Sequence, residues 1–160
     1  MTTSHHIPTS LIHYLDQYEA HYEVIPHKRD FTALSTAADT HTPPSSFAKC
    51  VLVWVDNYYA MVVTTADCWV DLRLLRDALG AAEAGLVREE EMTKLFPDCE
   101  LGAEPIFGNL YDLPVIVDSL LAKDETITFN AGTHDEAIRM PFAEFRRLVD
   151  PQILDCARPD

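Results

Sequence analysis

The chain has 160 residues, 48% of them hydrophobic and 24% charged, which suits a globular core and excludes extended disorder or a fibrous repeat. We therefore expect one domain over residues 1–160, with its core at about residues 9–150. The formal net charge of −14 argues against a general nucleic-acid-binding surface, because phosphate contacts usually need clustered basic residues, so any RNA contact must be local.

The first part of the chain predicts two short helices around an extended segment. Thr9 or Ser10 can cap the first helix. Its expected apolar face comprises Leu11, Leu15, Tyr18 and Tyr22. Residues 23–27 are expected to be extended, and residues 31–39 a second helix with Leu34, Ala37 and Ala38 facing inward. The two prolines in residues 40–46 predict a loop there.

The centre of the chain gives the strongest strand signal. Residues 47–55 and 58–65 are rich in β-branched and aromatic residues, and the two polar residues between them predict a β-hairpin. Asp71 can cap a helix that runs to Leu79, because Gly80 follows as a stop. A further helix is predicted over residues 89–96, with acidic residues in its first turn.

The C-terminal part predicts three extended segments and one helix. The extended segments are residues 113–117, 126–130 and 137–140, and the helix covers residues 141–149 with proline in its first turn. Strands follow one another in some places and alternate with helices in others. This order predicts an α+β fold, with a mixed, partly closed and curled β-sheet and flanking α-helices.

Several site classes are excluded by spacing. The four cysteines form no CxxC pair, which predicts buried free thiols rather than zinc or redox sites, and the histidines show no metal-binding pattern. We predict no metal and no cofactor. The first ten residues lack the apolar segment of a signal peptide, and no later run could cross a bilayer, so we expect a cytoplasmic protein without a membrane partner.

Lys49 is the most unusual residue of the sequence. In the segment FAKCVLVWV, strand alternation places it on the same face as Val51, Val53 and Val55. A lysine on an apolar face must reach solvent, find a partner or serve a ligand, because an unpaired buried charge is costly. A lysine that merely guards the mouth of a strand is the alternative interpretation.

Two further segments combine features of a ligand site. Residues 102–108, GAEPIFG, hold two glycines that would let backbone N–H groups approach a carbonyl oxygen or carboxylate. Residues 129–134, FNAGTH, place polar side chains just after a strand. An ordinary turn would explain either segment equally well.

Taken together, these three features resemble the YbaK/prolyl-tRNA-synthetase-associated domain family. The shared features are the strand-borne lysine, the glycine-containing loop and the FNAG stretch before a final strand and helix, in that order over about residues 9–150. The resemblance implies a trans-editing hydrolase that deacylates mischarged aminoacyl-tRNA at the ester of the 3′-terminal ribose. Ile106 and Glu104 depart from the family's loop pattern and leave the amino-acid preference open.

The resemblance also implies site residues. Lys49, Gly102 and His134 are the expected catalytic residues. The expected substrate-binding residues are Pro105, Phe107, Gly108, Asn130, Gly132 and Thr133. Apart from the resemblance, the scarcity of basic residues makes Lys28 and Arg29, with Lys49, the candidates for a few phosphate contacts, so Lys28 and Arg29 are also expected to bind substrate. The expected partners are the 3′ acceptor end of an aminoacyl-tRNA, bound weakly, and an aminoacyl-tRNA synthetase acting in trans. The alternatives are a non-catalytic module that binds an amino acid, a tRNA 3′ end or a synthetase, and a purely structural interaction protein.

Overall fold

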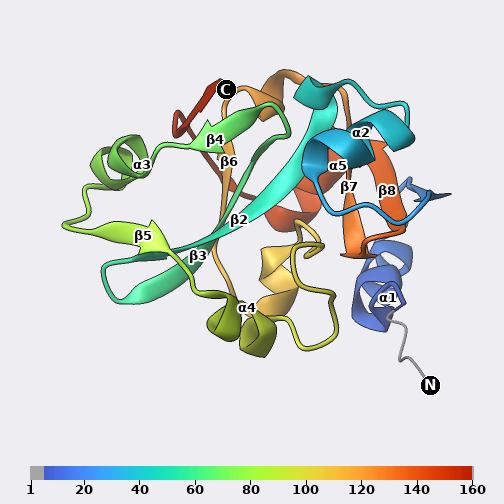
Figure 1. Cartoon of the computed structure of the whole chain (residues 1–160), viewed down its shortest axis with the longest axis horizontal. Coiled ribbons are helices and arrows are strands. Elements are labelled where there is room, and N and C mark those ends of the chain that lie inside the picture. The colour runs from blue at the N-terminus through green and yellow to red at the C-terminus, as the bar shows by residue number, and fades with distance from the viewer. Residues whose placement is uncertain (1–5, 160) are drawn as a thin grey trace.

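The computed structural model describes residues 6–159, which form a mixed sheet with helices on both sides (Figure 1). The strand order is β1-β8-β7-β2-β3-β6-β9, and β5 pairs with β2 beside this path. The pairs β1/β8, β7/β8, β2/β3 and β2/β5 are antiparallel, whereas β2/β7, β3/β6 and β6/β9 are parallel. The predicted α+β fold class is therefore confirmed.

The predicted strands all form, with small shifts of their ends. The strands of the main sheet are β1 (Glu23–Pro26), β2 (Phe47–Val55), β3 (Tyr58–Thr65), β5 (Ala84–Leu86), β6 (Val115–Asp118), β7 (Thr126–Thr133), β8 (Glu136–Pro141) and β9 (Gln152–Leu154). Two three-residue strands, β4 (Cys68–Val70) and β10 (Ala157–Pro159), pair separately. The strands β4, β5, β9 and β10 were not predicted, because three residues are too few to show an alternating pattern.

The predicted helices also form. They are α1 (Thr9–Gln17), α2 (Ala33–Asp39), α3 (Leu72–Leu79), α4 (Glu89–Leu95) and α5 (Phe142–Val149), with short 3₁₀ turns η1 (Pro44–Ser46), η2 (Gly108–Tyr111) and η3 (Leu121–Lys123). The Asp71 side chain caps α3 as expected, and Gly80 ends it in the left-handed conformation. No helix in residues 6–159 has the length and apolar character needed to span a membrane.

Two predicted helix faces are wrong in part. Helix α1 ends at Gln17, so Tyr22 lies outside it, and Tyr18 is exposed. Helix α2 buries Ala37, but Leu34 is 50% exposed and Ala38 is also exposed. Both errors have one physical cause. These helices are only two turns long, and each buries a single narrow stripe against the sheet rather than a full apolar face.

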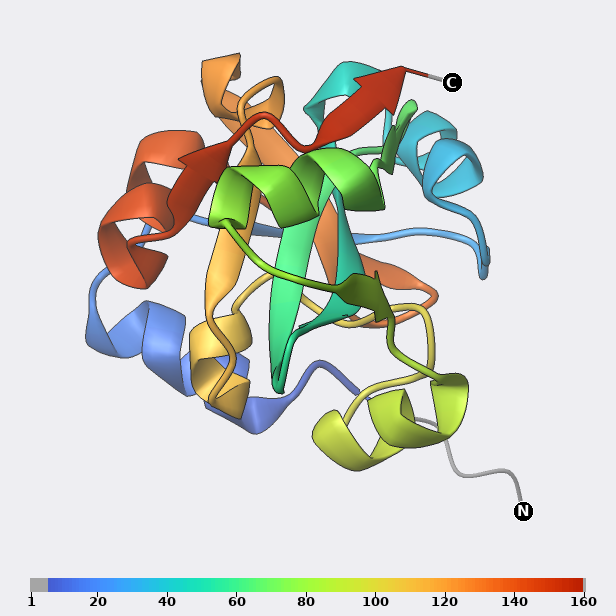
Figure 2. The same ribbon diagram turned by 90° about the vertical axis from the view of Figure 1, so that its left-hand side faces the viewer.

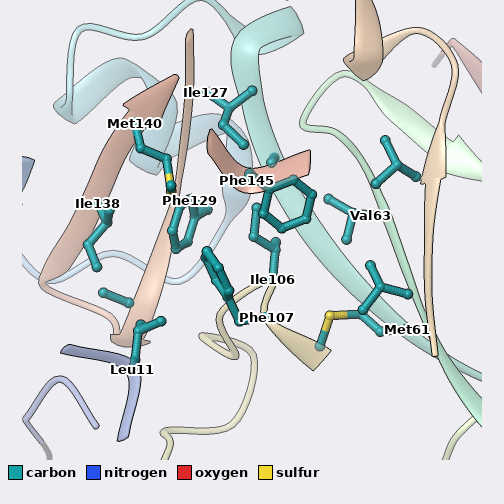
Figure 3. Close-up of a cluster of buried hydrophobic side chains, with 14 of the residues drawn as sticks. Leu11, Met61, Val63, Ile106, Phe107, Ile127, Phe129, Ile138, Met140 and Phe145 are labelled. Carbon is teal, nitrogen blue, oxygen red and sulfur yellow. The ribbon is translucent and has the colours of Figure 1, made fainter. Parts of the chain in front are cut away.

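The core has two sides because the sheet is covered on both faces. One face packs against α1 and α5 in a cluster dominated by phenylalanines, of which Figure 3 shows Phe107, Phe129 and Phe145 converging. The other face holds Val51, Val53 and Val55 with residues of α3, the helix that lies in front of β2 and β3 in Figure 2. Alternation along β2 therefore occurs as predicted.

Candidate active site

Lys49 lies on the second of these faces, close to where β2 begins. Its register partner across the antiparallel β2/β3 pair is Thr64, and such partners share a face with Cβ atoms about 5 Å apart. The Lys49 side chain is half-buried and forms none of the ion pairs found in residues 6–159. Thr64 is fully buried, and its hydroxyl finds no hydrogen-bond partner among the described residues.

Asn130 faces the same side from the neighbouring strand β7. The parallel register pairs Phe47 with Thr128, and Lys49 and Asn130 each follow two residues later, so their side chains point to the same face. The Asn130 side-chain oxygen is buried and also lacks a hydrogen-bond partner within residues 6–159. The Lys49 side chain, which has no carboxylate partner within residues 6–159, thus shares this face of the sheet with two buried oxygens that lack donors. Leaving those oxygens unpaired is costly unless a ligand supplies the missing hydrogen bonds.

The predicted loop lies against β7 through backbone hydrogen bonds. The Glu100 N–H donates to the Gly132 carbonyl at 2.8 Å, and the Gly132 N–H donates to the Ala103 carbonyl at 2.9 Å. Gly102 has φ of +87° and Gly132 has φ of +94°, a region that favours glycine. Glycine is therefore the residue that both of these turns favour.

The Gly102 N–H already has a partner. It donates to the Glu104 carboxylate at 2.8 Å, and Glu104 is almost completely buried. Burial raises the pKa of this carboxyl, and the hydrogen bond from Gly102 partly offsets that increase. A substrate oxygen that reaches the Gly102 N–H must therefore displace the Glu104 carboxylate.

His134 connects this loop to the segment before α2. Its Nε2 lies 2.7 Å from the Leu101 carbonyl oxygen, and its Nδ1 lies 3.1 Å from the Asp30 carbonyl oxygen. A neutral imidazole has one N–H, so it can donate to only one of these two acceptors. The His134 backbone N–H donates to the Glu100 carboxylate at 2.8 Å. The ring is thus held between two backbone segments, with Gly102 beside it.

Other predicted residues lie in the core rather than at a surface. Pro105 and Gly108 are buried, and Phe107 packs among Phe129, Phe145 and Tyr14 (Figure 3). A Cβ atom on Gly108 would lie 2.8 Å from a methyl group of Val115. The structure therefore separates Gly102, which is exposed, from the remainder of the loop, which is packed inside.

The predicted phosphate contacts are paired with acids. The Lys28 ammonium lies 3.6 Å from Asp39, and the Arg29 guanidinium pairs with Glu100. Thr133 is buried, and its hydroxyl lies 3.3 Å from the Glu136 carboxylate.

Two residues of this region, Glu100 and Thr64, were not predicted from the sequence. Nothing in a single sequence marks an acid or a hydroxyl that lies beside residues distant in the chain.

The cysteines give no nucleophile near this region. Burial, followed by the nearby Glu104 carboxylate, raises the pKa of the Cys50 thiol well above its ordinary value. Burial likewise raises the pKa of Cys99 to about 12. A thiol that stays protonated is a poor nucleophile. Cys68, Cys99 and Cys156 are buried as predicted, whereas Cys50 is only half-buried as a residue.

A cavity of about 430 Å³ lies at the far end of the β2/β3 hairpin, away from these groups. Its lining residues include Trp54, Tyr59, Leu86 and Arg88. Trp54 is five residues beyond Lys49, or roughly 16 Å along an extended strand. The polar groups around Lys49 and the hollow at the hairpin are therefore separate features.

Comparison with known proteins identifies relatives for nearly the whole chain. The family model described as aminoacyl-tRNA editing domain matches residues 27–148. The chain is 27% identical to the multifunctional Ser/Thr-tRNA deacylase ProXp-y of Escherichia coli strain K12 over 153 residues, covering 92% of this chain and 91% of the relative. The same figures hold for the protein of Escherichia coli O157:H7.

Solved structures share the fold at lower identity. A proposed trans-editing enzyme for prolyl tRNA synthetase superimposes with a TM-score of 0.82 at 18% identity, covering 92% of this chain and 94% of its own. Hypothetical protein APE2540 gives a TM-score of 0.83 at 15% identity, with 92% and 99% covered. These structural similarities support the fold alone.

Proposed function

The chain belongs to the aminoacyl-tRNA editing domain family, and from this premise we propose that Lys49, Asn130 and the Gly102 turn hold the aminoacylated 3′ end of tRNA for hydrolysis. The protein is a trans-editing hydrolase, an aminoacyl-tRNA deacylase. The observation that carries the assignment of the site is that Lys49, which forms no ion pair within residues 6–159, shares a face of the sheet with the buried, unpaired side-chain oxygens of Thr64 and Asn130.

The chemistry requires little from the protein beyond positioning. A water oxygen attacks the ester carbonyl carbon, the bond from that carbon to the ribose oxygen breaks, the ribose oxygen takes a proton, and the free amino acid leaves. Since an aminoacyl ester is already activated, orientation and stabilisation of the developing oxyanion can supply most of the rate increase. The Lys49 ammonium is the charge placed to stabilise that oxyanion or the terminal phosphate.

In this proposed site His134 has a positioning role. Both ring nitrogens face backbone carbonyl oxygens, at Asp30 and Leu101, so the ring ties the Gly102 turn to the segment before α2. A proton transfer by His134 would require the ring to leave one of these contacts. We therefore assign it the role of fixing the Gly102 turn against the substrate.

The experiment that tests the proposed function is deacylation of a panel of mischarged tRNAs. Seryl- and threonyl-tRNA come first in the panel, because the Escherichia coli relative is named for these two substrates. We expect at least one member to be hydrolysed far faster than its spontaneous rate. A panel that decays at the spontaneous rate throughout would contradict the function.

We further propose that tRNA binding is weak and limited to the acceptor end, and that a synthetase supplies additional binding affinity in trans. The pairing of Lys28 with Asp39 and of Arg29 with Glu100 supports this, because both cations are already partly neutralised. Each phosphate contact in a single strand adds roughly 0.7 to the slope of log affinity against log salt. One to three contacts predict a slope of magnitude about 2 or less. A steep slope for the protein alone would contradict this binding mode.

A further inference from the structure

Phe31 is the most exposed large hydrophobic residue of the described chain, with 68% of its surface open to solvent. It directly precedes Thr32, the N-cap of α2. Most exposed apolar residues need no explanation, but a phenylalanine ring loses far more water-exposed area on contact with a ligand than a smaller side chain does. The contacts that Phe31 makes with its neighbours therefore bear on whether its ring binds a ligand.

The ring is fixed in place rather than extended freely into solvent. The Phe31 N–H donates to the Asp30 side chain at 2.9 Å, and the Asp30 N–H donates to the His134 carbonyl at 3.0 Å. The Phe31 ring lies 4.6 Å from the His134 ring, centroid to centroid. The Arg29 guanidinium carbon lies 5.4 Å from the Phe31 centroid. Holding the ring in this way removes much of the entropy cost of using it in binding.

The ring also belongs to the side of the sheet that carries Lys49. Helix α2 packs Ala37 on Phe47, and Phe47 precedes Lys49 by two residues on the same face of β2. In Figure 1, α2 lies in front of the region where β2 begins. His134, on which Phe31 rests, is also the residue beside Gly102. The exposed ring therefore borders the candidate active site.

We propose that Phe31 is the stacking platform for the terminal nucleobase of the acceptor 3′ end, with Arg29 at its border. An aromatic ring next to a guanidinium is the combination that holds bases of single-stranded nucleic acids. The base is attached to the same ribose as the reacting ester, so a platform at the rim leaves the ester free to reach Lys49. This inference rests on the proposed function and adds a contact for the base to it.

The test combines variants of Phe31 with variants of the terminal base. We expect Phe31→Ala to lower kcat/KM about 10- to 100-fold on an aminoacylated acceptor-stem mimic, the factor that one stacked base contributes. On a mimic whose terminal nucleotide lacks its base, the same substitution is expected to change kcat/KM less than threefold. Equal losses on the two mimics would overturn the proposal, because the base would then not be the group that Phe31 contacts.

Further variants distinguish stacking of Phe31 on the terminal base from packing of Phe31 on His134. Phe31→Trp and Phe31→Tyr retain an aromatic face and are expected to stay within about threefold of wild type, whereas Phe31→Leu retains only apolar volume and is expected to resemble Phe31→Ala. Leu34→Ala is the matched control, because Leu34 is 50% exposed on the adjacent helix. If Leu34→Ala loses as much activity as Phe31→Ala, the patch is an apolar interface and the proposal fails.

A binding measurement keeps this inference distinct from the proposed function. A non-hydrolysable amide analogue of the acceptor end, with 2-aminopurine as its terminal base, is expected to lose fluorescence on binding wild type and to keep it with Phe31→Ala. Quenching that depends on Phe31 would support the platform even if no tRNA were deacylated. Deacylation by the wild type without such quenching would leave the function intact and overturn the platform.

Discussion

The two ends of strand β2 differ in the polar groups and in the cavity volume that they present to a ligand. Where the strand begins, Lys49 lies beside Thr64 and Asn130, whose buried oxygens lack donors in the described residues. Where it ends, Trp54 and Leu86 line a cavity of about 430 Å³. The first end thus has buried polar atoms without hydrogen-bond partners, and the second end has a cavity.

The two ends differ in the hydrogen-bond partners of their polar groups. At the hairpin end the two carboxylates that line the cavity, Asp56 and Glu91, already have partners. The Asp56 carboxylate accepts hydrogen bonds from the Ala82 and Glu83 N–H groups, and Glu91 pairs with Lys94. At the Lys49 end two buried oxygens remain without partners, which costs free energy that a ligand could recover. This difference is why we propose that the reaction takes place at the Lys49 end.

The largest expected effect is that of Lys49→Ala. Removal of one preorganised charge-stabilising group commonly lowers kcat on the order of a hundredfold or more, and we expect a loss of that size in deacylation with the melting temperature retained. Lys49→Arg is not expected to restore activity, since a planar guanidinium does not replace a compact ammonium. Lys123→Ala, at an exposed lysine of η3, is the control for loss of charge. Turnover near wild type in Lys49→Ala would move the reaction away from this end of β2.

The two loop glycines are expected to respond differently to alanine. At Gly102 an added Cβ atom would lie 3.5 Å from His134, but φ of +87° strains any other residue and shifts the turn. At Gly108 the Cβ atom would press on Val115 in the core, an overpacking that costs about 1–3 kcal/mol. We expect Gly102→Ala to lower kcat/KM at least tenfold at 25 °C.

Gly108→Ala should instead lower the melting temperature, by about 2–12 °C, with turnover of the folded protein retained. Measuring kcat/KM well below both melting temperatures separates the two effects. If Gly108→Ala were the variant that lost turnover while keeping its stability, the buried part of the loop would be the part that contacts substrate.

Much of the fold could be predicted from the sequence because local patterns specify it. The β2/β3 hairpin follows from β-branched and aromatic residues around Asp56, and α3 from its Asp71 cap and Gly80 stop. Strand β5 could not be predicted, because it consists of three residues and forms only by pairing with β2. Burial of Leu34 was predicted wrongly, since tertiary packing rather than periodicity decides which side of a two-turn helix is covered.

For the candidate site, the sequence predicted individual residues but not the contacts between them. Lys49 stands out as a charge within an apolar strand, and the glycines of the loop stand out as backbone signals. The contact of the Gly102 N–H with Glu104, and that of His134 with Phe31, join residues through turns that no periodicity encodes. These contacts decide which glycine is exposed and where a base could stack.

A smaller effect is expected from Glu104→Gln and appears in the pH dependence of stability. Burial raises the pKa of this carboxyl above its ordinary value of 4.5. The folded state therefore favours the protonated form, and the stabilisation is fully present below pH 4.5 and is lost as pH rises through the raised pKa. Because glutamine does not titrate, the melting temperature of Glu104→Gln should fall less than that of wild type between pH 4.5 and pH 8.

Glu125→Gln, at an exposed position, is the control, and its melting temperature should follow that of wild type across the same range. Parallel curves for Glu104→Gln and wild type would contradict the prediction, because they would show that burial does not raise the pKa of the Glu104 carboxyl in the folded protein.

The smallest effects are expected at the hairpin cavity. Leu86 is 60% exposed there, and Arg88 is an exposed cation followed directly by three glutamates, so its field is largely cancelled for an approaching phosphate. We expect Leu86→Ala and Arg88→Ala to keep kcat/KM within about twofold and to leave the salt dependence of tRNA binding unchanged, because one neutralised cation contributes little counterion release. The measurement is deacylation of the best substrate of the panel across a salt series, with Lys49→Ala beside it. A tenfold loss in either hairpin variant, with a shallower salt slope in Arg88→Ala, would show that the substrate reaches both ends of β2 and that the cavity is part of its path.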